Sequence, residues 1–432
     1  PPYISKADFS GLEKPMIKMN IWSSSEFKRN GAVMQYSTDG GINWSNLGNI
    51  GEGINWFDSE NIVSQPGGLL QFVGWNEVPM TDWVSARQSL DIVKGGKNIR
   101  FRIAYASDGK GISRVDGFAF DDIWIGERSQ NILTEYFTNT QSTASSQANN
   151  YLNQYEKERA SDLVPIHYHT GNPSGDSLYL SYKEGPSSRV FYYGVTQTPF
   201  VISNGVLNSS LNNDASKSLF ENANGVQTLN DPLISIGLQL TQANIGVNIT
   251  SNTDVLKGKN LALYAAIVKD SIPVEGEFYY NVLRRFLPDP GGISLETADF
   301  TAWETLSKTI PLNLGNKPEF IGSKLVVFVQ NISTKEIYQT VTEKLTATTA
   351  INPENINLLI DMYPNPAADY LFIDSQIDIE TITILDISGR IVDQIKPEQR
   401  SFSIPVYDLK YGMYVIKGTT SKGEFIKKFI RQ

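Results

Sequence analysis

Two histidines, His167 and His169, are the side chains of this sequence best suited to acid–base or metal chemistry. They stand two positions apart in a run that predicts a β-strand, so both should project from one face at a spacing that can bind a metal. Two ligands without a nearby acidic or third histidine partner make a weak site. We therefore expect a structural role for both, and a multi-histidine zinc site or a catalytic triad has almost nothing to be built from.

Cysteine is absent from the 432 residues. Without it the chain as written can form no disulfide, no thiolate metal site and no cysteine nucleophile. Ser142 is a weak candidate nucleophile because no histidine base lies close to it in the sequence, and it is better suited to cap a helix that starts there. Enzymatic functions therefore start at a disadvantage, and no residues support a protease.

Three aspartates, Asp116, Asp121 and Asp122, lie close together at the end of a tryptophan-rich region. Carboxylates are hard oxygen ligands that Ca²⁺ accepts in flexible geometry. The cluster is a candidate calcium site, and a turn with solvated acids is the alternative. Apart from calcium we expect no cofactor.

The composition is that of ordinary folded protein, with 19% charged and 40% hydrophobic residues and a net charge of −9. The length implies about three or four domains of roughly 100–200 residues each. The acidic balance argues against a nucleic-acid partner, because phosphate contacts need clustered Lys and Arg. The longest strongly apolar run, near 325–329, is far below the ~20 residues of a membrane-spanning helix. The first residues lack the features of a signal peptide, so we expect a processed chain or a fragment.

The elements that must position these side chains change in type along the chain. Residues 1–127 contain most of the tryptophans and short alternating runs separated by Gly, Asn and Asp, which predicts an antiparallel sandwich or jelly roll. Residues 128–228 alternate strand and helix patterns, which predicts an α/β unit. Its first helix should run from near Ser142 to Leu163, directly before the strand that carries both histidines.

Strands dominate again in residues 229–346, which predicts a β-sandwich with one helical insertion near Tyr280 to Leu287. Residues 347–357 are low in bulky apolar side chains and predict a linker. Residues 358–432 alternate with period two and predict a small sandwich of seven or eight strands. The predicted fold class is therefore a mostly β multidomain protein.

This last segment resembles the type A C-terminal sorting domain of the type IX secretion system of Bacteroidota. Four motifs appear in order at the family's spacing, and the prolines of the first one should form a rigid entry into a strand. The residues that carry the resemblance, and that we expect to form the sorting signal, are Tyr363, Pro364, Asn365, Pro366, Gly389, Arg390, Gly412, Tyr414, Lys427 and Lys428.

The resemblance implies passage through the outer membrane, with the domain acting as an address. Its partners would be the outer-membrane translocon, a shuttle protein and a sortase that cleaves the domain and attaches the cargo to lipopolysaccharide. The location it implies is secreted, or anchored at the outer face of the outer membrane. A terminal immunoglobulin-like module without this role is the alternative.

Residues from about 128 to 346 resemble a family of Bacteroidota surface proteins related to a 28-kilodalton outer membrane protein, which join a thioredoxin-like domain to a β-sandwich. The match rests mainly on residues 133–140, 193–200 and 281–288. It implies that Pro199 is the cis-proline of a thioredoxin fold. It also implies that Ser142 and Ser145 occupy the place where redox-active relatives carry a Cys-x-x-Cys pair.

Two explanations of the serines remain open. Either the lineage has lost the chemistry and keeps the fold as a scaffold, or the serines are engineered replacements of cysteines. Serine hydroxyls do not ionise near neutral pH and form no disulfide, so the chain as written cannot exchange thiols.

Residues 1–127 resemble MAM-like, galactose-binding-type jelly rolls that are common in secreted Bacteroidota proteins. The match rests on residues 31–44, 83–86, 101–108 and 117–123. Such domains usually have strands before a segment like residues 9–12, so we expect the chain to begin inside a domain. Core packing accounts for most of the tryptophans, and a sugar platform is the alternative.

These observations favour a secreted or surface-anchored, non-enzymatic interaction or adhesion protein that is delivered by the type IX system and binds a surface glycan or a protein. Two alternatives remain. One is an extracellular thiol–disulfide oxidoreductase whose cysteines are replaced by Ser142 and Ser145, and the other is a calcium-dependent glycan-binding protein.

Overall fold

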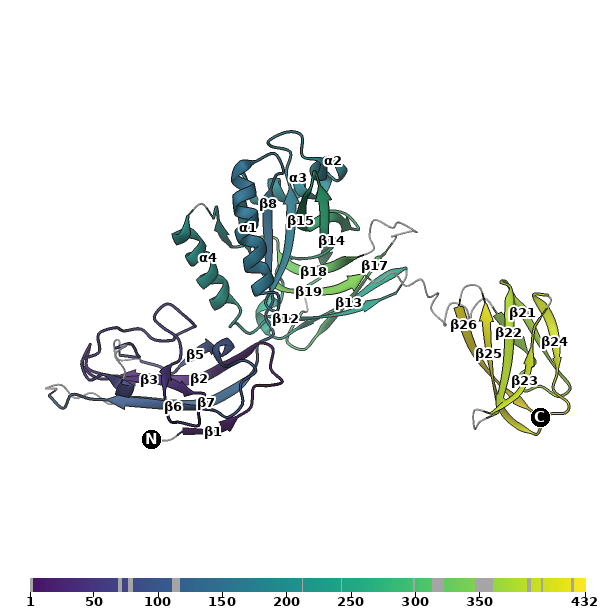
Figure 1. Ribbon diagram of the computed structural model, residues 1–432, viewed down its shortest axis with the longest axis horizontal. Helices are drawn as coiled ribbons and strands as arrows, with labels where there is room; N and C mark the ends of the chain where they lie inside the picture. The colour runs from purple at the N-terminus through teal and green to yellow at the C-terminus, as the bar shows by residue number, and fades with distance from the viewer. Residues whose placement is uncertain are drawn as a thin grey trace. The chain divides into compact units, whose positions relative to one another are not determined.

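The computed structural model describes residues 3–68, 72–76, 81–110, 117–211, 213–241, 243–297, 300–312, 322–345, 360–386, 390–397, 399–420 and 423–432. It divides into two compact units, Pro1–Leu345 and Thr346–Gln432. The described residues form mainly β-strands arranged in several sheets (Figure 1), which confirms the predicted fold class. Among them, no helix has the length and apolar character that crossing a membrane requires.

Two antiparallel sheets enclose one core at the start of the first unit. Their strand orders are β1-β6-β3-β4 and β5-β2-β7. Strand β2 alternates as predicted, with Ile17, Met19 and Ile21 fully buried between the sheets. The tryptophans differ in burial, since Trp75 lies in this core and Trp83 is half-exposed. The bounds are β1 (Tyr3–Ala7), β2 (Pro15–Ser24), β3 (Gly31–Ser37), β4 (Ser45–Asn46), β5 (Val84–Ser89), β6 (Ile99–Ala106) and β7 (Gly117–Glu127), with single 3₁₀ turns at Pro66–Gly68 and Asp91–Val93.

A long mixed sheet follows, with the strand order β11-β10-β8-β9-β15-β14-β18-β19 and β16 paired to β14. Strands β8 and β9 are parallel, and β15 joins them to the antiparallel part of the sheet. The sheet therefore continues across residue 228, where the sequence pattern changes from α/β to β. The bounds are β8 (Ile132–Thr138), β9 (Leu163–His169), β10 (Phe200–Ser203), β11 (Leu207–Ser209), β14 (Leu261–Val274), β15 (Glu277–Leu287), β16 (Ile293–Leu295), β18 (Ser323–Asn331) and β19 (Ile337–Leu345).

Helices cover the parallel end of this sheet on both faces (Figure 1). Helix α1 (Thr143–Glu158) packs Ala148, Leu152 and Tyr155 against one face, because these residues recur at helical spacing. Helix α4 (Asp214–Gln227) packs on the same face through Phe220 and begins at a capping box that the sequence analysis missed. The other face is covered by α3 (Glu184–Tyr193), which follows the short α2 (Ser177–Ser181).

The predicted helix near Tyr280 to Leu287 is wrong. These residues belong to β15, which pairs with β14 along most of its length and with β9 at one residue. Leu283 and Phe286 are buried at a spacing of three, and this spacing imitates a helix. A register irregularity in the β14–β15 pairing breaks the period of two, so the pairing overrides the local pattern.

A second antiparallel sheet, ordered β12-β13-β17, packs on the antiparallel part of the long sheet and encloses an aliphatic core. Its bounds are β12 (Ile234–Leu240), β13 (Asn244–Ser251) and β17 (Thr305–Pro311), with a 3₁₀ turn at Asp254–Leu256. Ile245, Val247 and Ile249 alternate into this core. The two layers agree with the β-sandwich pattern of the sequence.

The second unit is a separate sandwich with its own core. One sheet is ordered β20-β21-β24 and the other β23-β22-β25-β26, all antiparallel. The bounds are β20 (Ile360–Tyr363), β21 (Tyr370–Ser375), β22 (Ile379–Asp386), β23 (Ile391–Ile395), β24 (Ser401–Pro405), β25 (Gly412–Thr420) and β26 (Gly423–Arg431). Strand β21 alternates exposed and buried residues, as the period of two in the sequence predicts.

Candidate functional site

The proline segment of the predicted sorting signal lies along the open edge of β26. The side chain of Asn365 accepts a hydrogen bond from the Ile430 amide (2.9 Å) and donates one to the Lys428 carbonyl (3.1 Å). Ala367 continues the contact, because its amide donates to the Ile430 carbonyl and its carbonyl accepts from the Gln432 amide. Residues 364–367 thus act as a short parallel partner for the last strand, which blunts an otherwise open edge.

The two prolines that flank Asn365 form cis peptide bonds, Tyr363–Pro364 and Asn365–Pro366. They turn the chain between β20 and Ala367, so that one carboxamide faces the backbone of β26. A carboxamide suits this place because it carries one acceptor and a donor group, like a peptide unit. The motifs at 363–366 and 427–431, far apart in the sequence, therefore form one structure.

The remaining predicted sorting residues have separate surroundings. Tyr414 is buried, and its hydroxyl donates to the Lys410 carbonyl (2.9 Å). Arg390 is exposed and pairs with Asp386 (3.1 Å). Gly412 begins β25, and Lys427 and Lys428 lie in β26 with their side chains on opposite faces. Gly389 lies outside the described residues.

Ser142 and Ser145 stand at the start of α1. Ser142 is the N-cap, and its hydroxyl accepts a hydrogen bond from the Ser145 amide (3.2 Å). Ser145 is fully buried, and its hydroxyl has no hydrogen-bond partner in the part of the chain that the structure describes. The Thr198–Pro199 bond is cis and directly precedes β10.

The two histidines are buried and have different carboxylate partners. His167 lies 3.0 Å from Glu156 of α1, and His169 lies 2.8 Å from Asp176, which caps α2. Burial lowers the pKa of His169 in spite of Asp176. Burial by itself would raise the pKa of Asp176, but its hydrogen bonds and the neighbouring histidine lower it below the usual value. A neutral His169 that donates to an ionised Asp176 fits both directions.

Two of the three predicted calcium ligands lie in the part of the chain that the structure describes. Asp121 and Asp122 are exposed residues of β7, and Asp122 accepts a hydrogen bond from Asn20 (2.8 Å). Asp116 lies outside the described residues. Among the residues that the structure does describe, no group of three or more His, Asp or Glu side chains could hold a metal ion. The calcium site stays a prediction.

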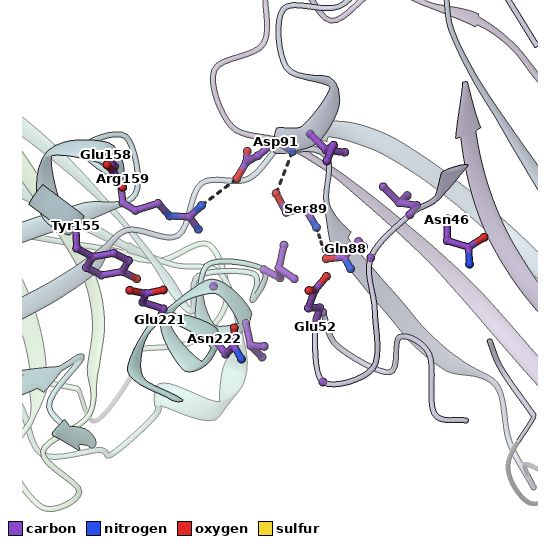
Figure 2. A pocket seen from close by; sticks show the side chains of 18 of the residues that line it. Asn46, Glu52, Gln88, Ser89, Asp91, Tyr155, Glu158, Arg159, Glu221 and Asn222 are labelled. Atoms are coloured by element: carbon purple, nitrogen blue, oxygen red, sulfur yellow. Dashed lines mark hydrogen bonds and ion pairs between the residues drawn. The ribbon is translucent and has the colours of Figure 1, made fainter. Parts of the chain in front are cut away.

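The sequence analysis missed a cleft of about 830 Å³ inside the first unit, between the N-terminal sandwich and helices α1 and α4. Figure 2 shows Tyr155 and Glu158 of α1, Arg159 directly after it, and Glu221 and Asn222 of α4 on one side of the cleft. Asn46, Glu52 and Gln88 of the sandwich lie on the other side. Its lining comes from segments more than 150 residues apart in the chain, so no local pattern announces it.

The cleft is acidic. Glu52, Asp91, Glu158 and Glu221 line it, together with one cation, Arg159. Arg159 is already committed to Asp91 (3.4 Å). Each carboxylate accepts a hydrogen bond within the protein, from Asn49, Arg128, Gln154 and Tyr151 respectively. A carboxylate has about four lone-pair sites, so it can accept further hydrogen bonds from hydroxyls or amines.

Tyrosine and aliphatic side chains supply the apolar surface of the cleft. Tyr151 and Tyr155 stack one above the other on α1, with ring centroids 6.2 Å apart. The Tyr151 hydroxyl donates to Glu221 (2.6 Å), which joins α1 to α4. Burial and this carboxylate raise the pKa of Tyr151, so the hydroxyl stays protonated at neutral pH. Aromatic rings beside hydrogen-bonding groups make a surface suited to polar organic ligands.

A buried ion-pair network fixes the two walls of the cleft relative to each other. Arg128, between the sandwich and β8, donates to Asp162 (2.7 Å) and to Asp91 (2.9 Å). It also donates to the Pro15 carbonyl of β2 (3.0 Å). The guanidinium is thus shared by groups of the sandwich and of the long sheet, and its planar fork favours one orientation.

A second buried pair lies behind the sheet, where Glu135 of β8 binds Arg189 of α3 through two hydrogen bonds of 2.8 Å. Tyr168 and Tyr193 also donate to Glu135, and Gln330 accepts from Arg189. The hydrogen bonds of Glu135 and Arg189 are made to other residues of this network, and they hold α3 on the sheet. An acid inside the apolar run of β8 was a signal for it, because a buried carboxylate must be paired.

Comparisons with known proteins place the C-terminal unit. Residues 361–432 match the family model of the secretion system C-terminal sorting domain. No curated protein matches the chain in sequence.

Among solved structures, HBP35 of Porphyromonas gingivalis is similar at 14% identity and a TM-score of 0.39, over 71% of this chain and 99% of that one. A domain of the outer membrane lipoprotein Omp28 from Porphyromonas gingivalis is similar at 18% identity and a TM-score of 0.17, over 27% of this chain and 89% of that one. PorZ of Porphyromonas gingivalis, described as an essential surface component of the type-IX secretion system, is similar at 14% identity and a TM-score of 0.17, over 43% of this chain and 29% of that one.

At these TM-scores the structural similarities carry no inference about function. The family match does, because residues 361–432 include every residue that is expected to form the sorting signal. The C-terminal unit is a secretion system C-terminal sorting domain, and it marks the chain for export by the type IX system as a surface or secreted protein.

Proposed function

We propose that this chain is a non-enzymatic binding protein, an adhesion or interaction protein that works at the outer face of the outer membrane or in the surrounding medium. The observation that carries the proposal is the sorting domain at 361–432. The first unit would be the cargo, and its α/β part a thioredoxin-like scaffold without thiol chemistry. The translocon, a shuttle protein and a sortase would be its partners during export.

The binding site in this proposal is the acidic cleft between the N-terminal sandwich and helices α1 and α4. Its volume of about 830 Å³ is in the range of sites for small molecules or short chains. Carboxylates and tyrosines favour a ligand rich in hydroxyl or ammonium groups, so a surface glycan or a basic protein segment fits better than an anion.

Binding arrays test the site. The full chain is applied to glycan and peptide arrays beside the variant Glu52→Gln/Glu221→Gln, which keeps shape but removes two charges of the cleft. We expect the signal of the best ligand to fall by about tenfold for each carboxylate that contacts it, and so by about a hundredfold when both do, taking about 1.4 kcal/mol for each lost charged contact. The matched control is Glu343→Gln on β19, an exposed acid that does not line the cleft.

Two results would count against the proposal. Equal signals for the cleft variant and for Glu343→Gln would remove the cleft as the site. Turnover of the bound glycan or peptide by the purified chain would overturn the non-enzymatic part.

A second candidate is a thiol–disulfide oxidoreductase whose cysteines stand replaced by Ser142 and Ser145. One observation favours it, namely that the Ser145 hydroxyl is buried without a described partner. A thiol is a weaker hydrogen-bonding group than a hydroxyl, so it loses less when it is buried in such a place. The helix start would also stabilise a thiolate at this position.

The variant Ser142→Cys/Ser145→Cys tests this candidate. If the scaffold is redox-competent, the reduced pair gives two electrons and two protons to a disulfide of insulin. The insulin disulfide becomes two thiols, and the pair becomes a disulfide. Precipitation of reduced insulin reports the reaction, with Ser142→Cys alone as the control. An intact insulin disulfide in the presence of the reduced double variant would eliminate the candidate.

A further inference from the structure

The outer face of the sheet β20-β21-β24 in the sorting domain exposes a group of aromatic side chains. Tyr363, Tyr370, Phe372 and Tyr407 are 53%, 48%, 45% and 50% exposed. Tyr370 and Phe372 of β21 alternate with Leu371 and Ile373, which point into the core, so both rings lie on the outer face. Tyr363 ends β20, and Tyr407 follows β24. A contiguous aromatic group at a water-facing sheet surface marks an interaction site.

Ring contacts hold these side chains in place. Tyr363 and Phe372 are directly opposite across β20 and β21, and their rings stack with centroids 5.9 Å apart. The rings of Tyr370 and Tyr407 meet edge to face at 6.0 Å. Rigid aromatic side chains lose little conformational freedom when a partner covers them, which is why they dominate the energetics of protein interfaces.

The charged side chains on the strands of this face are acidic, and the neighbouring arginines are used within the unit, since Arg431 donates to the Val406 and Tyr407 carbonyls and Arg400 pairs with Asp378. Asp361 and Asp374 are directly opposite in the neighbouring row of the same two strands, and both are exposed. Strands β20, β21 and β24 contain no lysine or arginine. An anionic partner would meet repulsion here, while a basic one would find complementary charge.

The outer face of the other sheet differs in chemistry. There β25 and β26 present Met413, Ile426 and Ile430, all about half-exposed, together with Lys417 and Lys428. The aromatic, acidic face and the aliphatic, basic face thus belong to the same unit but suit different surfaces.

We propose that the aromatic face, defined by Tyr363, Tyr370, Phe372 and Tyr407, docks on a protein of the export machinery whose contact surface is apolar and rimmed by Lys or Arg. The proposal rests on the proposed function, because it names the surface through which the sorting domain is recognised. Tyr363 connects it to the sorting motif, since this residue directly precedes the proline segment that holds β26.

Export of the full chain in a type IX-competent bacterium tests the proposal. Tyr370→Thr/Phe372→Thr replaces two exposed rings by a residue that suits strands. The matched control is Met413→Thr/Ile426→Thr on the other outer face. The measured quantity is the fraction of the chain outside the outer membrane against the fraction in the periplasm, by fractionation and added protease. Thermal unfolding of the purified variants is measured in parallel, to show whether a variant is destabilised.

We expect the exported fraction of Tyr370→Thr/Phe372→Thr to fall by about tenfold or more while unfolding is unchanged, as for loss of interface anchors. The charge-reversal variant Asp361→Lys/Asp374→Lys should also reduce export, because it places positive charge opposite a partner surface rimmed by Lys or Arg. Wild-type export of the aromatic variant overturns the proposal, and so does an equal loss for the control pair. Sedimentation that shows a dimer dispersed by the aromatic variant would assign the face to a second copy of this chain instead. If a chain shortened after Leu345 is exported normally, export does not depend on the sorting domain and the assignment of the face fails. A chain that is exported normally but binds nothing on the arrays would count against the proposed function and leave the assignment of the face intact.

Discussion

At the scale of single residues, the clearest case is Asn365, whose side chain takes the place of a peptide group. It satisfies one donor and one acceptor of β26 that no neighbouring strand covers. The sequence pattern identified the motif by resemblance and turn chemistry. Only the fold brings it to the last strand, because the two segments are separated by about sixty residues.

Replacing Asn365 should loosen the end of β26. We expect Asn365→Ala to destabilise the sorting domain by about 1 kcal/mol, since the hydrogen bonds it loses are exposed to water. Hydrogen exchange of the Ile430 amide measures the effect and should accelerate. Asn365→Asp is the matched variant, because it keeps the acceptor for Ile430 and loses the donor to Lys428. An unchanged exchange rate in Asn365→Ala would contradict the role of the side chain.

Ser142 and Ser145 should respond to substitution in opposite directions. Ser142→Ala removes an N-cap and should cost about 1 kcal/mol of stability. Ser145→Ala removes a buried hydroxyl without a described partner and should stabilise by about 1 kcal/mol. Chemical denaturation of the full chain, followed by the ellipticity of the first unit's helices, compares the two. A destabilised Ser145→Ala would mean that the hydroxyl is satisfied in solution.

At the scale of elements, the start of α2 and the end of β9 are joined by His169 and Asp176. The pair links the strand that the sequence predicted to a short helix that it did not. Asp176 also accepts hydrogen bonds from the amides of Thr140, Leu178 and Tyr179, so a single carboxylate organises three segments.

This arrangement predicts that the first unit loses stability in acid. The pKa of His169 in the folded chain lies below its ordinary 6.5, so the unfolded chain binds the extra proton first as the pH falls. The pKa of Asp176 is lowered as well, so its contribution is lost at still lower pH, as that carboxylate becomes protonated. Because the pKa of each group is lower in the folded chain than in the unfolded chain, both groups make the folded state less stable as the pH falls.

Thermal unfolding between pH 8 and pH 4 measures this dependence, with His169→Gln as the comparison. We expect a flatter profile for the variant as the pH falls below 6.5, where the folded and unfolded states of the wild type differ in protonation of the histidine. A wild-type profile that rises as the pH falls through this range would contradict the assignment of a neutral His169.

At the scale of the whole molecule, the first unit depends on Arg128 to connect its N-terminal sandwich to the long sheet. The Arg128 side chain is 1% exposed and bridges carboxylates on both sides. Arg128 follows directly after the sandwich and connects it to the rest of the first unit. The cleft lies beside this bridge, since Asp91 both pairs with Arg128 and lines the cleft.

Truncation of this bridge should be severe. Arg128→Ala leaves Asp162 buried without its main partner, and we expect a loss of about 3–5 kcal/mol together with faster proteolysis near residue 128. Arg159→Ala is the matched control, because this arginine contacts the same two aspartates from a more exposed position and should cost less than about 1 kcal/mol. Calorimetry and limited proteolysis compare the variants. Equal losses for both would show that burial does not distinguish them.

The sequence by itself determined the mostly β character, the α/β pattern after residue 128 and the sorting domain at the C-terminus, because each depends on local periodicity or on motifs within short segments. It placed the strand of His167 and His169 and the cap at Ser142 correctly for the same reason. The sequence did not predict the features that depend on contacts between segments far apart in the chain. Tyr280 to Leu287 form a strand only because β14 and β9 pair with them, and the cleft, the Arg128 bridge and the edge contact of Asn365 exist only after folding. Pairing and burial across long sequence separations outweigh local propensity, so these features belong to the tertiary structure.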